Sequence, residues 1–368
     1  MTAEPLRVCI VGPLPPPSGG MANQTRQLAE LLGNEGFRVA VVQTNAGYRP
    51  SWVRHLRGLR AGFRLVPYAL RLWSQLRDAD LVHLMANSGW SWFLFAVPAA
   101  AVARLRAVPL VVNYRGGEAA PFLARSAWAV RPIARRAAAL VVPSGFLQQV
   151  FDRFGMPAVI VPNIVDLARF RPVTARSAPG VHLIVARNLE PIYDNATAIR
   201  ALALIRQEVP EVRLTIAGEG PLLASLQRLA AGLGLAEAVR FCGRVANAEM
   251  PRLYASADVC LNPSLADNMP ISLLESLASG VPVVSTNVGG VPYLVENERT
   301  ALLVEPGDPA AMAQAVLRLL RDVSLNARLR AEGLEQVRRF DWASVRPQLL
   351  AMYAAATNRA VEVRAGVA

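Results

Sequence analysis

The chain has 368 residues, of which 53% are hydrophobic and 18% charged, and its formal net charge is +12. This length suggests two domains, and the composition excludes an intrinsically disordered chain because it supplies enough apolar side chains for packed cores. The three cysteines and three histidines stand far apart. Their spacing excludes a disulfide framework and a cysteine zinc site, shows no histidine metal-ligand pattern, and fits a reducing compartment.

The positive charge is concentrated in the first half of the chain. All 39 basic residues are arginine; residues 1–165 contain 18 of them against 7 acidic residues, whereas residues 166–368 contain 21 against 20. This excess predicts an anionic partner for the first half: a nucleic acid, a membrane surface or an anionic substrate.

Neither a secretory signal nor a membrane span is expected. The N-terminus carries Glu4 and leads directly into a strand-like run. The longest apolar stretch has its core at Gly89–Ala103, which is short for a bilayer crossing, so we predict a buried helix there. The expected location is cytoplasmic.

Short apolar runs alternate with helical patterns through the first half. Leu6–Val11 is predicted to be a buried strand, and a helix follows at about Met21–Glu35. Continuous Val, Ile and Leu runs separated by helices indicate a parallel sheet covered on both faces. Further strands are predicted at Val39–Gln43, Leu81–Met85, Leu110–Tyr114, Leu140–Pro143 and Val159–Pro162.

The same alternation starts again after Asp166–Pro179, a segment that reads as a linker. The second half therefore predicts another doubly wound α/β unit, and its ligands are expected beyond the carboxyl ends of the strands. The predicted strands are Val181–Ala186, Val212–Ala217, Val239–Cys242, Val259–Pro263 and Val281–Ser285, and the helices are Asn195–Gln207, Gly220–Leu233, Ala248–Ala255, Met269–Ser279 and Pro309–Asp322.

The loop Gly12–Met21 joins the first strand to the first helix and contains Gly19 and Gly20. Glycines there let the backbone approach a ligand, and the helix N-terminus favours an anion. The loop matches neither GxGxxG nor the ATPase phosphate loop. The alternative interpretation is ordinary turn chemistry.

Asp267 and Glu275 stand eight residues apart, the first in a loop and the second two turns into a predicted helix. The N–H groups of Asn268, Met269 and Ile271 are expected to face a phosphate at the helix N-terminus. Glu275 would accept hydrogen bonds from a ribose diol. The alternative is a solvated acidic cap with a surface glutamate.

The segment Pro263–Ser285 closely resembles the signature of the retaining glycosyltransferases of family 4, the group 1 family: an acid, seven residues, a glutamate and a G-x-P-V-V tail. The resemblance covers nearly the whole chain and implies the GT-B architecture, with two Rossmann-like domains across a cleft. Other matching segments are Gly19–Met21, Val142–Ser144, Val161–Asp166, Ala217–Leu222, Gly289–Pro292, Leu303–Asp308 and Phe340–Trp342.

The resemblance implies three parts: an acceptor domain at 1–165, a nucleotide-sugar domain at 166–342, and a last helix at 343–368 that returns to the first domain. It also implies roles by position. Asp267 would face the sugar hydroxyls, Glu275 the ribose and Arg187 the diphosphate. The remaining donor-binding residues implied are Gly19, Gly20, Arg244, Asn268, Met269, Pro270 and Ile271.

Three positions depart from the family pattern. No lysine follows Arg187, and Tyr193 stands in that region; Arg115 occupies the place of a frequent histidine; Tyr293 replaces a glutamate. Arg115 stays protonated, so it can clamp a phosphate but not act as a base. We count it with Asp267 and Arg187 as a catalytic candidate.

Asn87, Ser88 and Glu118 are the acceptor candidates, because the loops that hold them follow strands. Asp78-Ala-Asp80 precedes a strand and therefore lies at the wrong end of the sheet for a metal site. Residues 52–77 interleave arginines with Trp, Leu and Phe. This stretch suits an anionic membrane surface, and the alternative is an ordinary solvated helix face.

The expected function is sugar transfer from a nucleotide diphosphate donor, with retention and without a metal or other cofactor, to a lipid-linked or polysaccharide-related hydroxyl acceptor. The expected place of action is the inner membrane face. Two alternatives remain: a nucleotide-sugar epimerase or phosphorylase on the same fold, and a polyanion-binding protein. No nucleic-acid motif is present, so nucleic acid is not an expected partner.

Overall fold

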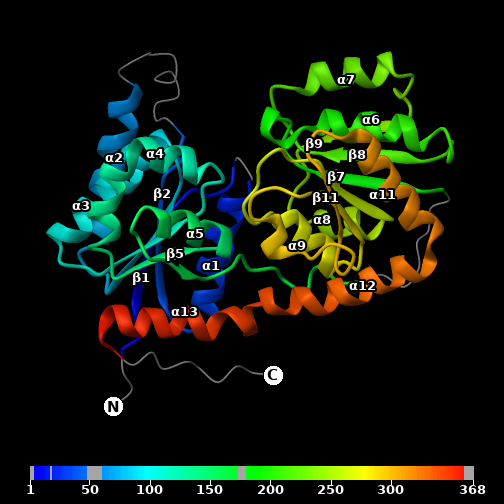
Figure 1. Ribbon diagram of the computed structural model, residues 1–368. Coiled ribbons are helices and arrows are strands. Elements are labelled where there is room, and N and C mark those ends of the chain that lie inside the picture. The colour runs from blue at the N-terminus through cyan, green and yellow to red at the C-terminus, as the bar shows by residue number, and fades with distance from the viewer. Residues whose placement is uncertain (1–3, 17–18, 48–59, 173–179, 360–368) are drawn as a thin grey trace. The chain divides into compact units, whose positions relative to one another are not determined.

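Two parallel six-stranded sheets with helices packed against them make up the described part of the chain in the computed structural model (Figure 1). The structure describes residues 4–16, 19–47, 60–172 and 180–359. Its contacts group the chain into two units: unit 1 is Met1–Pro162 with Val345–Ala368, and unit 2 is Asn163–Ser344. The boundaries expected from the sequence lay at 165 and 342.

The sheet of unit 1 has the order β2-β1-β3-β4-β5-β6, and every pair is parallel. β3 and β4 are buried along their whole length, as continuous apolar runs in a two-sided sheet require. The strands are β1 (Arg7–Gly12), β2 (Arg38–Gln43), β3 (Leu81–Ala86), β4 (Leu110–Tyr114), β5 (Ala139–Val142) and β6 (Val159–Ile160).

The helices of unit 1 include one irregular segment. Val97 N–H donates to Trp92 O, so a π-helical turn precedes α3 where a single helix was predicted. Pro98 brings no N–H to the ladder, which favours this wider turn before it. The helices are α1 (Gly20–Asn34), α2 (Arg60–Gln75), η2 (Trp92–Ala96), α3 (Val97–Leu105), α4 (Ala119–Ala134), α5 (Gly145–Arg153) and α13 (Trp342–Thr357).

The last helix, α13, belongs to unit 1 from Val345 onward. Arg346 pairs with Glu35 at 3.1 Å, and the ring of Tyr353 packs edge-on against Phe37 with 6.4 Å between centroids. The return of this helix to the first unit, which the family resemblance implied, is confirmed.

The sheet of unit 2 has the order β12-β11-β10-β7-β8-β9, again parallel throughout. β12 was not predicted, because three residues are too few to show a period. The strands are β7 (His182–Ala186), β8 (Arg213–Ala217), β9 (Val239–Gly243), β10 (Val259–Asn262), β11 (Val283–Thr286) and β12 (Leu302–Val304).

The helices of unit 2 follow the predicted alternation, and α9 begins at Ile271 rather than Met269. Phe170, in the expected linker, is buried in the core beside Tyr254. The helices are η3 (Pro191–Tyr193), α6 (Asn195–Ile205), α7 (Leu223–Gly232), α8 (Met250–Ala255), α9 (Ile271–Ala278), α10 (Val291–Leu294), α11 (Pro309–Arg321), α12 (Val323–Val337) and η4 (Arg338–Phe340).

The predicted fold class, two doubly wound α/β units, is confirmed. Among the helices that the structure describes, none combines the length and the hydropathy needed to cross a bilayer.

Candidate active site

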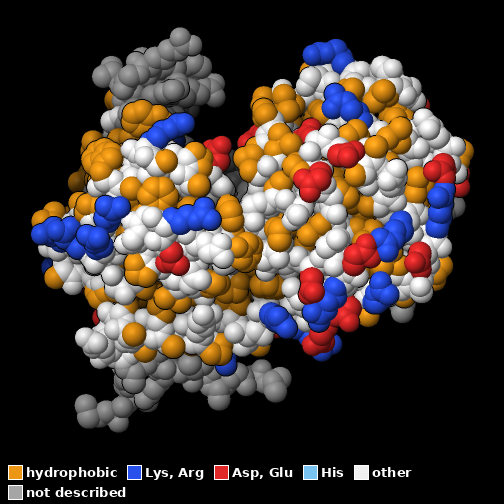
Figure 2. All heavy atoms as spheres, in the orientation of Figure 1, with side chains coloured by type: hydrophobic (Ala, Val, Ile, Leu, Met, Phe, Trp, Pro, Cys, Tyr) orange, Lys and Arg blue, Asp and Glu red, His pale blue; other side chains and the backbone are white. Residues whose placement is uncertain are grey.

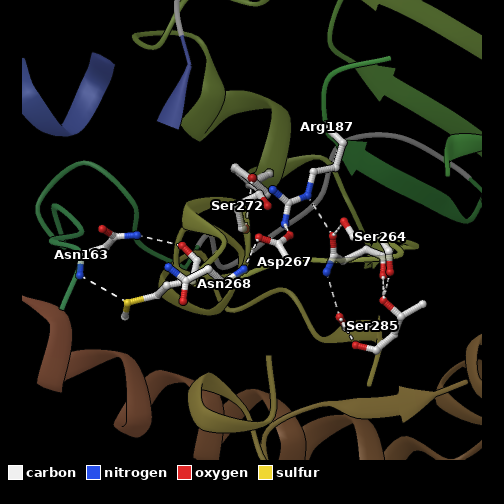
Figure 3. A network of polar contacts seen from close by, with 11 residues as sticks. Asn163, Arg187, Ser264, Asp267, Asn268, Ser272 and Ser285 are labelled. Atoms are coloured by element: carbon white, nitrogen blue, oxygen red, sulfur yellow. Dashed lines mark hydrogen bonds and ion pairs between the residues drawn. The ribbon is translucent and has the colours of Figure 1, made fainter. Parts of the chain in front are cut away.

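Arg187 and Asp267 meet at the carboxyl ends of two neighbouring strands of unit 2 (Figure 3). Arg187 directly follows β7, and Asp267 lies in the loop after β10. The Arg187 guanidinium forms an ion pair with Asp267 Oδ2, and the two side chains are only 11% and 12% exposed. Asp267 is therefore not the solvated cap of the alternative interpretation.

Asn262, the last residue of β10, orients the Arg187 side chain. Its Oδ1 accepts hydrogen bonds from Arg187 Nε at 2.8 Å and from Ser264 Oγ at 2.9 Å. Its Nδ2 donates to Ser285 Oγ at 2.9 Å, which fixes the direction of the amide. No motif in the sequence singles out Asn262; its place near the carboxyl end of the predicted strand Val259–Pro263 is the signal that the sequence offers.

Two glycine turns hold the backbone under this ion pair. A Cβ at Gly218 would lie 1.9 Å from the carbonyl oxygen of Arg187, and a Cβ at Gly289 would lie 2.1 Å from that of Asp267. Gly290 is equally close to the carbonyl of Asn268, at 1.9 Å, and its N–H donates to Asp267 O at 3.0 Å. Only glycine permits these close approaches. The turns after β8 and β11 therefore pack directly against the backbone of Arg187 and Asp267.

The ring of Tyr193 lies against the Arg187 guanidinium. The distance from the guanidinium carbon to the ring centroid is 5.3 Å. The residue is in the region where the family has a lysine. Burial raises the pKa of the Tyr193 hydroxyl, so it stays protonated. An aromatic ring therefore supports Arg187 here, and Tyr193 adds no second cation.

The loop before α9 uses some of its polar groups internally. Asn268 N–H donates to Asp267 Oδ1 at 2.9 Å, so it is not directed at a phosphate as expected. Met269 is buried, its carbonyl accepts from Asn163 Nδ2 at 2.8 Å, and Pro270 carries no N–H. Of the predicted N–H donors, Ile271 is the one in the first turn of the helix.

Glu275 is half-buried on α9, which contradicts the alternative of a surface glutamate. The Tyr254 hydroxyl lies 3.1 Å from its Oε2. Burial raises the pKa of Glu275 to about 7, although Tyr254, Arg169 and Arg187 favour the ionised form. The carboxyl group is therefore poised to change charge near neutral pH.

Arg244 directly follows β9 and pairs with Glu219 of the Gly218–Gly220 turn. Their side chains are 38% and 52% exposed. Because all strands of the sheet are parallel, Arg244 lies at the same edge of the sheet as Arg187. The two arginines have different acidic partners, Glu219 and Asp267.

In unit 1, Arg115 follows β4 and is held by a chain of buried groups. Its Nε donates to Asn113 Oδ1 at 3.1 Å, and Asn113 Nδ2 lies 3.0 Å from His83 Nε2. Since Arg115 can only donate, Asn113 Nδ2 must be the donor to His83. His83 Nδ1 therefore carries the proton and donates to the Tyr353 hydroxyl at 2.7 Å.

Burial lowers the pKa of His83 to about 3, and the nearby Arg115 charge acts in the same direction. The imidazole is therefore neutral, as the hydrogen bonds require. Burial also lowers the pKa of Arg115, to about 10, which leaves it a cation at neutral pH.

The acceptor candidates lie around the end of β3. Ser88 Oγ and the Tyr114 hydroxyl are 2.7 Å apart, and Asn87 Oδ1 accepts from Ser88 N–H at 2.8 Å. A Cβ at Gly116 would lie 2.2 Å from Ser88 Oγ, so the backbone of Gly116 packs directly against the Ser88 side chain. Glu118 is exposed and precedes α4.

The glycine loop of unit 1 differs from expectation in one respect. Gly19 precedes α1, which begins at Gly20, and a Cβ at Gly19 would have no atom of the described residues within 4 Å. The crowded position is Gly12, whose Cβ would lie 2.9 Å from both Met85 Cβ and Thr25 Oγ1. Packing therefore requires glycine at position 12, whereas no contact among the described residues requires it at position 19.

Asp80, at the amino end of β3, forms a hydrogen bond and an ion pair within the protein. It accepts from Arg7 N–H at 2.8 Å and pairs with Arg359 at 2.9 Å. Across residues 4–16, 19–47, 60–172 and 180–359, no three His, Cys, Asp or Glu side chains come together as a metal site would need.

Comparison with known proteins identifies the family of the chain. The family model described as Glycosyl transferases group 1 matches residues 180–322, and that described as Glycosyltransferase Family 4 matches residues 18–169. Glycogen synthase of Mycobacterium tuberculosis is 31% identical over 314 residues, which cover 81% of this chain and 73% of that protein. The chain belongs to the group 1 glycosyltransferase family.

Two other relatives match this glycosyltransferase over different shares of their length. A GDP-mannose-dependent alpha-(1-6)-phosphatidylinositol monomannoside mannosyltransferase of M. tuberculosis is 28% identical over 367 residues, covering 89% of this chain and 92% of the relative. D-inositol 3-phosphate glycosyltransferase of Streptomyces avermitilis is 32% identical over 222 residues, or 55% of this chain. The chain spans about half of the latter protein, 47%.

Anabaena HepE, solved in complex with UDP and glucose, superimposes on the glycosyltransferase with a TM-score of 0.75 at 19% identity. The match covers 95% of this chain and 100% of HepE. This similarity confirms the GT-B fold.

Proposed function

We propose that this glycosyltransferase moves a sugar from a nucleoside diphosphate donor to a hydroxyl acceptor, with retention of configuration. The observation that carries the proposal is the Arg187–Asp267 ion pair at the ends of β7 and β10. A departing diphosphate develops negative charge, which a pre-positioned guanidinium stabilises. The donor named for the M. tuberculosis relative is GDP-mannose, and HepE was solved with UDP; both support a nucleotide-sugar donor.

Arg187 and Asp267 divide the work at the donor. Asn262 holds Arg187 by its Nε and Asp267 pairs with its Nη2, so Nη1 is the guanidinium nitrogen directed to a phosphate oxygen. Asp267 would accept hydrogen bonds from sugar hydroxyls and favour an oxocarbenium-like sugar. Their mutual ion pair keeps both side chains ordered before the donor binds.

Glu275 would accept hydrogen bonds from the ribose diol. This role requires the ionised form, because that form has two acceptor oxygens and carries no proton. Arg244 and Glu219 lie farther along the same edge of the sheet and would flank the nucleobase. We propose no metal requirement, since Arg187 and the N–H groups at the start of α9 provide the positive potential that a leaving diphosphate needs. Undiminished turnover in excess EDTA is the expected result.

The acceptor would bind unit 1 through Asn87, Ser88 and Glu118, and Arg115 would act as a phosphate clamp in the same unit. We propose a lipid-linked acceptor at the inner membrane face. Three observations support it: the excess of arginine in residues 1–165, the phosphatidylinositol acceptor in the name of the M. tuberculosis relative, and the exposed apolar side chains of α2. Figure 2 shows orange and blue side chains with few red ones over the visible face of unit 1.

The test measures nucleoside diphosphate release and donor binding in Arg187→Gln, Asp267→Asn and Glu275→Gln variants. A thermal-shift screen with UDP-, GDP-, ADP- and TDP-sugars first identifies the donor; a ligand at 100 times its Kd stabilises by about 2.7 kcal/mol. We expect each variant to lose at least tenfold in turnover or in donor affinity (about 1.4 kcal/mol or more). Wild-type values in all three would reject the site.

A further inference from the structure

A pocket of about 290 Å³ lies at the carboxyl end of β2, between that strand and α2. Gln43 and Thr44 line it from the strand side, and Phe63, Arg64, Tyr68 and Arg71 line it from the helix. None of the described residues that line it is acidic. The pocket is therefore lined by two guanidinium groups and two aromatic rings. It lies at the edge of the sheet where ligands of parallel α/β units bind.

The two arginines of the pocket are on one face of α2, because residues seven apart in a helix are separated by nearly two full turns. Arg64 is anchored: its guanidinium donates to Thr44 O at 3.0 Å and lies 5.3 Å from the centroid of the Phe95 ring. Tyr68 is fixed by a hydrogen bond from its hydroxyl to Phe95 O at 2.8 Å. The wall of the pocket is therefore largely pre-formed, whereas Arg71 is exposed at its rim.

An exposed apolar stripe runs along α2 next to the pocket. Phe63, Val66, Leu70 and Trp73 follow the spacing of a helix face and are 44%, 59%, 65% and 46% exposed. Trp73 is covered on one side by Arg106, whose guanidinium carbon lies 3.8 Å from the ring centroid. A solvated helix face would carry polar residues at these positions. Part of the arginine-rich stretch noted in the sequence, residues 52–59, lies outside the described residues.

We propose that the pocket binds the phosphate of an amphipathic phosphate ester, the apolar chain of which lies along the α2 stripe. Two guanidinium groups in a pocket whose described lining residues include no carboxylate suit a phosphate. A soluble phosphate compound would leave the stripe exposed, so the pairing of pocket and stripe selects a lipid. This inference rests on the proposed function, because it takes the acceptor to be lipid-linked. The pocket would then bind the phosphate in the head group of that acceptor.

The test uses dihexanoyl phosphatidic acid below its micelle concentration as the probe, with inorganic phosphate as the tail-free comparison. Arg71→Gln removes a pocket cation and Leu70→Ser interrupts the stripe; both positions are exposed, so folding should be maintained. Arg77→Gln is the matched control, because Arg77 is also an exposed arginine near the end of α2 but does not line the pocket.

We expect Arg71→Gln to weaken phosphatidic acid binding about tenfold, the size of a lost charge-assisted hydrogen bond. Leu70→Ser should weaken it about threefold and leave inorganic phosphate binding unchanged. Arg77→Gln should stay within about twofold of the wild type, since an exposed charge outside the pocket contributes little. Unchanged binding in Arg71→Gln, or an equal loss in Arg77→Gln, would overturn the pocket; phosphate that binds as tightly as the lipid would overturn the amphipathic ligand.

Donor binding by the wild-type protein is measured in parallel as a nucleotide-sugar thermal shift. Donor binding without phosphatidic acid binding would reject the pocket and leave the proposed function standing. Phosphatidic acid binding without donor binding would reject the proposed function and leave the pocket standing.

Discussion

The hydroxyl of Tyr353 on the last helix lies 2.7 Å from Nδ1 of His83 in the middle of the first sheet. Both side chains are fully buried. Through Asn113 this contact continues to Arg115, so the C-terminal helix helps to set the direction of a candidate acceptor-binding cation. The helix is therefore part of the architecture of the site in unit 1 and not merely a cover for the sheet.

Tyr353→Phe should destabilise the protein by about 1–3 kcal/mol, because it leaves the His83 Nδ1–H buried without an acceptor. Chemical denaturation measures the loss. Tyr293→Phe serves as the control, since Tyr293 is 47% exposed and its change should stay within about 0.5 kcal/mol. If Arg115 depends on the chain of hydrogen bonds, Tyr353→Phe should also raise the acceptor KM more than it lowers kcat. Equal stability of Tyr353→Phe and the wild type would contradict the hydrogen-bond assignment.

His83 should make stability fall as the pH is lowered. Its pKa is about 3 in the native protein and about 6.5 for an exposed histidine, so between these values the unfolded chain binds the additional proton. The free energy of unfolding then decreases by up to about 1.4 kcal/mol for each pH unit lost in that window. Unfolding titrations between pH 4 and 6 should show a shallower slope in His83→Gln than in the wild type. Parallel slopes would mean that His83 is not neutral and buried as described.

Glu275 should make donor binding depend on pH around neutrality. Its pKa of about 7 means that the carboxylate forms as the pH rises from 6 to 8, so donor affinity should rise over the same range. The sign for stability is the reverse: the native group holds its proton above the ordinary glutamate pKa of 4.5, so its contribution to stability is lost as the pH rises from 4.5 toward 7. Glu275→Gln should bind the donor without this pH dependence. A donor Kd that changes with pH identically in both proteins would rule out this role.

Gly218→Ala should disturb the Arg187 loop, because the new methyl group would lie 1.9 Å from the Arg187 carbonyl oxygen. The backbone must move, and we expect at least a tenfold loss of turnover together with lower stability. Gly232→Ala is a matched control in the same unit. Gly232 ends α7 and has open space around it, so alanine there should be neutral or stabilise by up to about 1 kcal/mol. Similar outcomes for the two variants would show that the close approach does not matter.

The Arg187–Asp267 pair should behave as a coupled unit. Asp267→Asn or Arg187→Gln alone leaves a largely buried charge without its partner, at a cost of about 3–5 kcal/mol. The double variant Arg187→Met with Asp267→Leu should regain much of that stability but remain inactive, because the apolar pair cannot bind a diphosphate. A double-mutant cycle on the free energy of unfolding measures the coupling. Additive losses would show that the two side chains do not interact.

The amino-acid sequence by itself determined the alternation of strands and helices and the placement of Asp267, Glu275, Arg187 and Arg115 in segments after or between strands. These features follow from local periodicity and chain order, since side chains that are near in sequence share one element and the ends of parallel strands share one edge.

Only the tertiary structure decided which groups touch. Asn262 beneath Arg187, Gly218 and Gly289 against the two charged loops, and Tyr353 on His83 join positions far apart in the chain. The three-residue strand β12 and the π-turn at Trp92–Ala96 depend on partners in other segments or on one missing N–H. No local pattern encodes such contacts, because they exist only when the packing of the whole unit brings the groups within hydrogen-bonding distance.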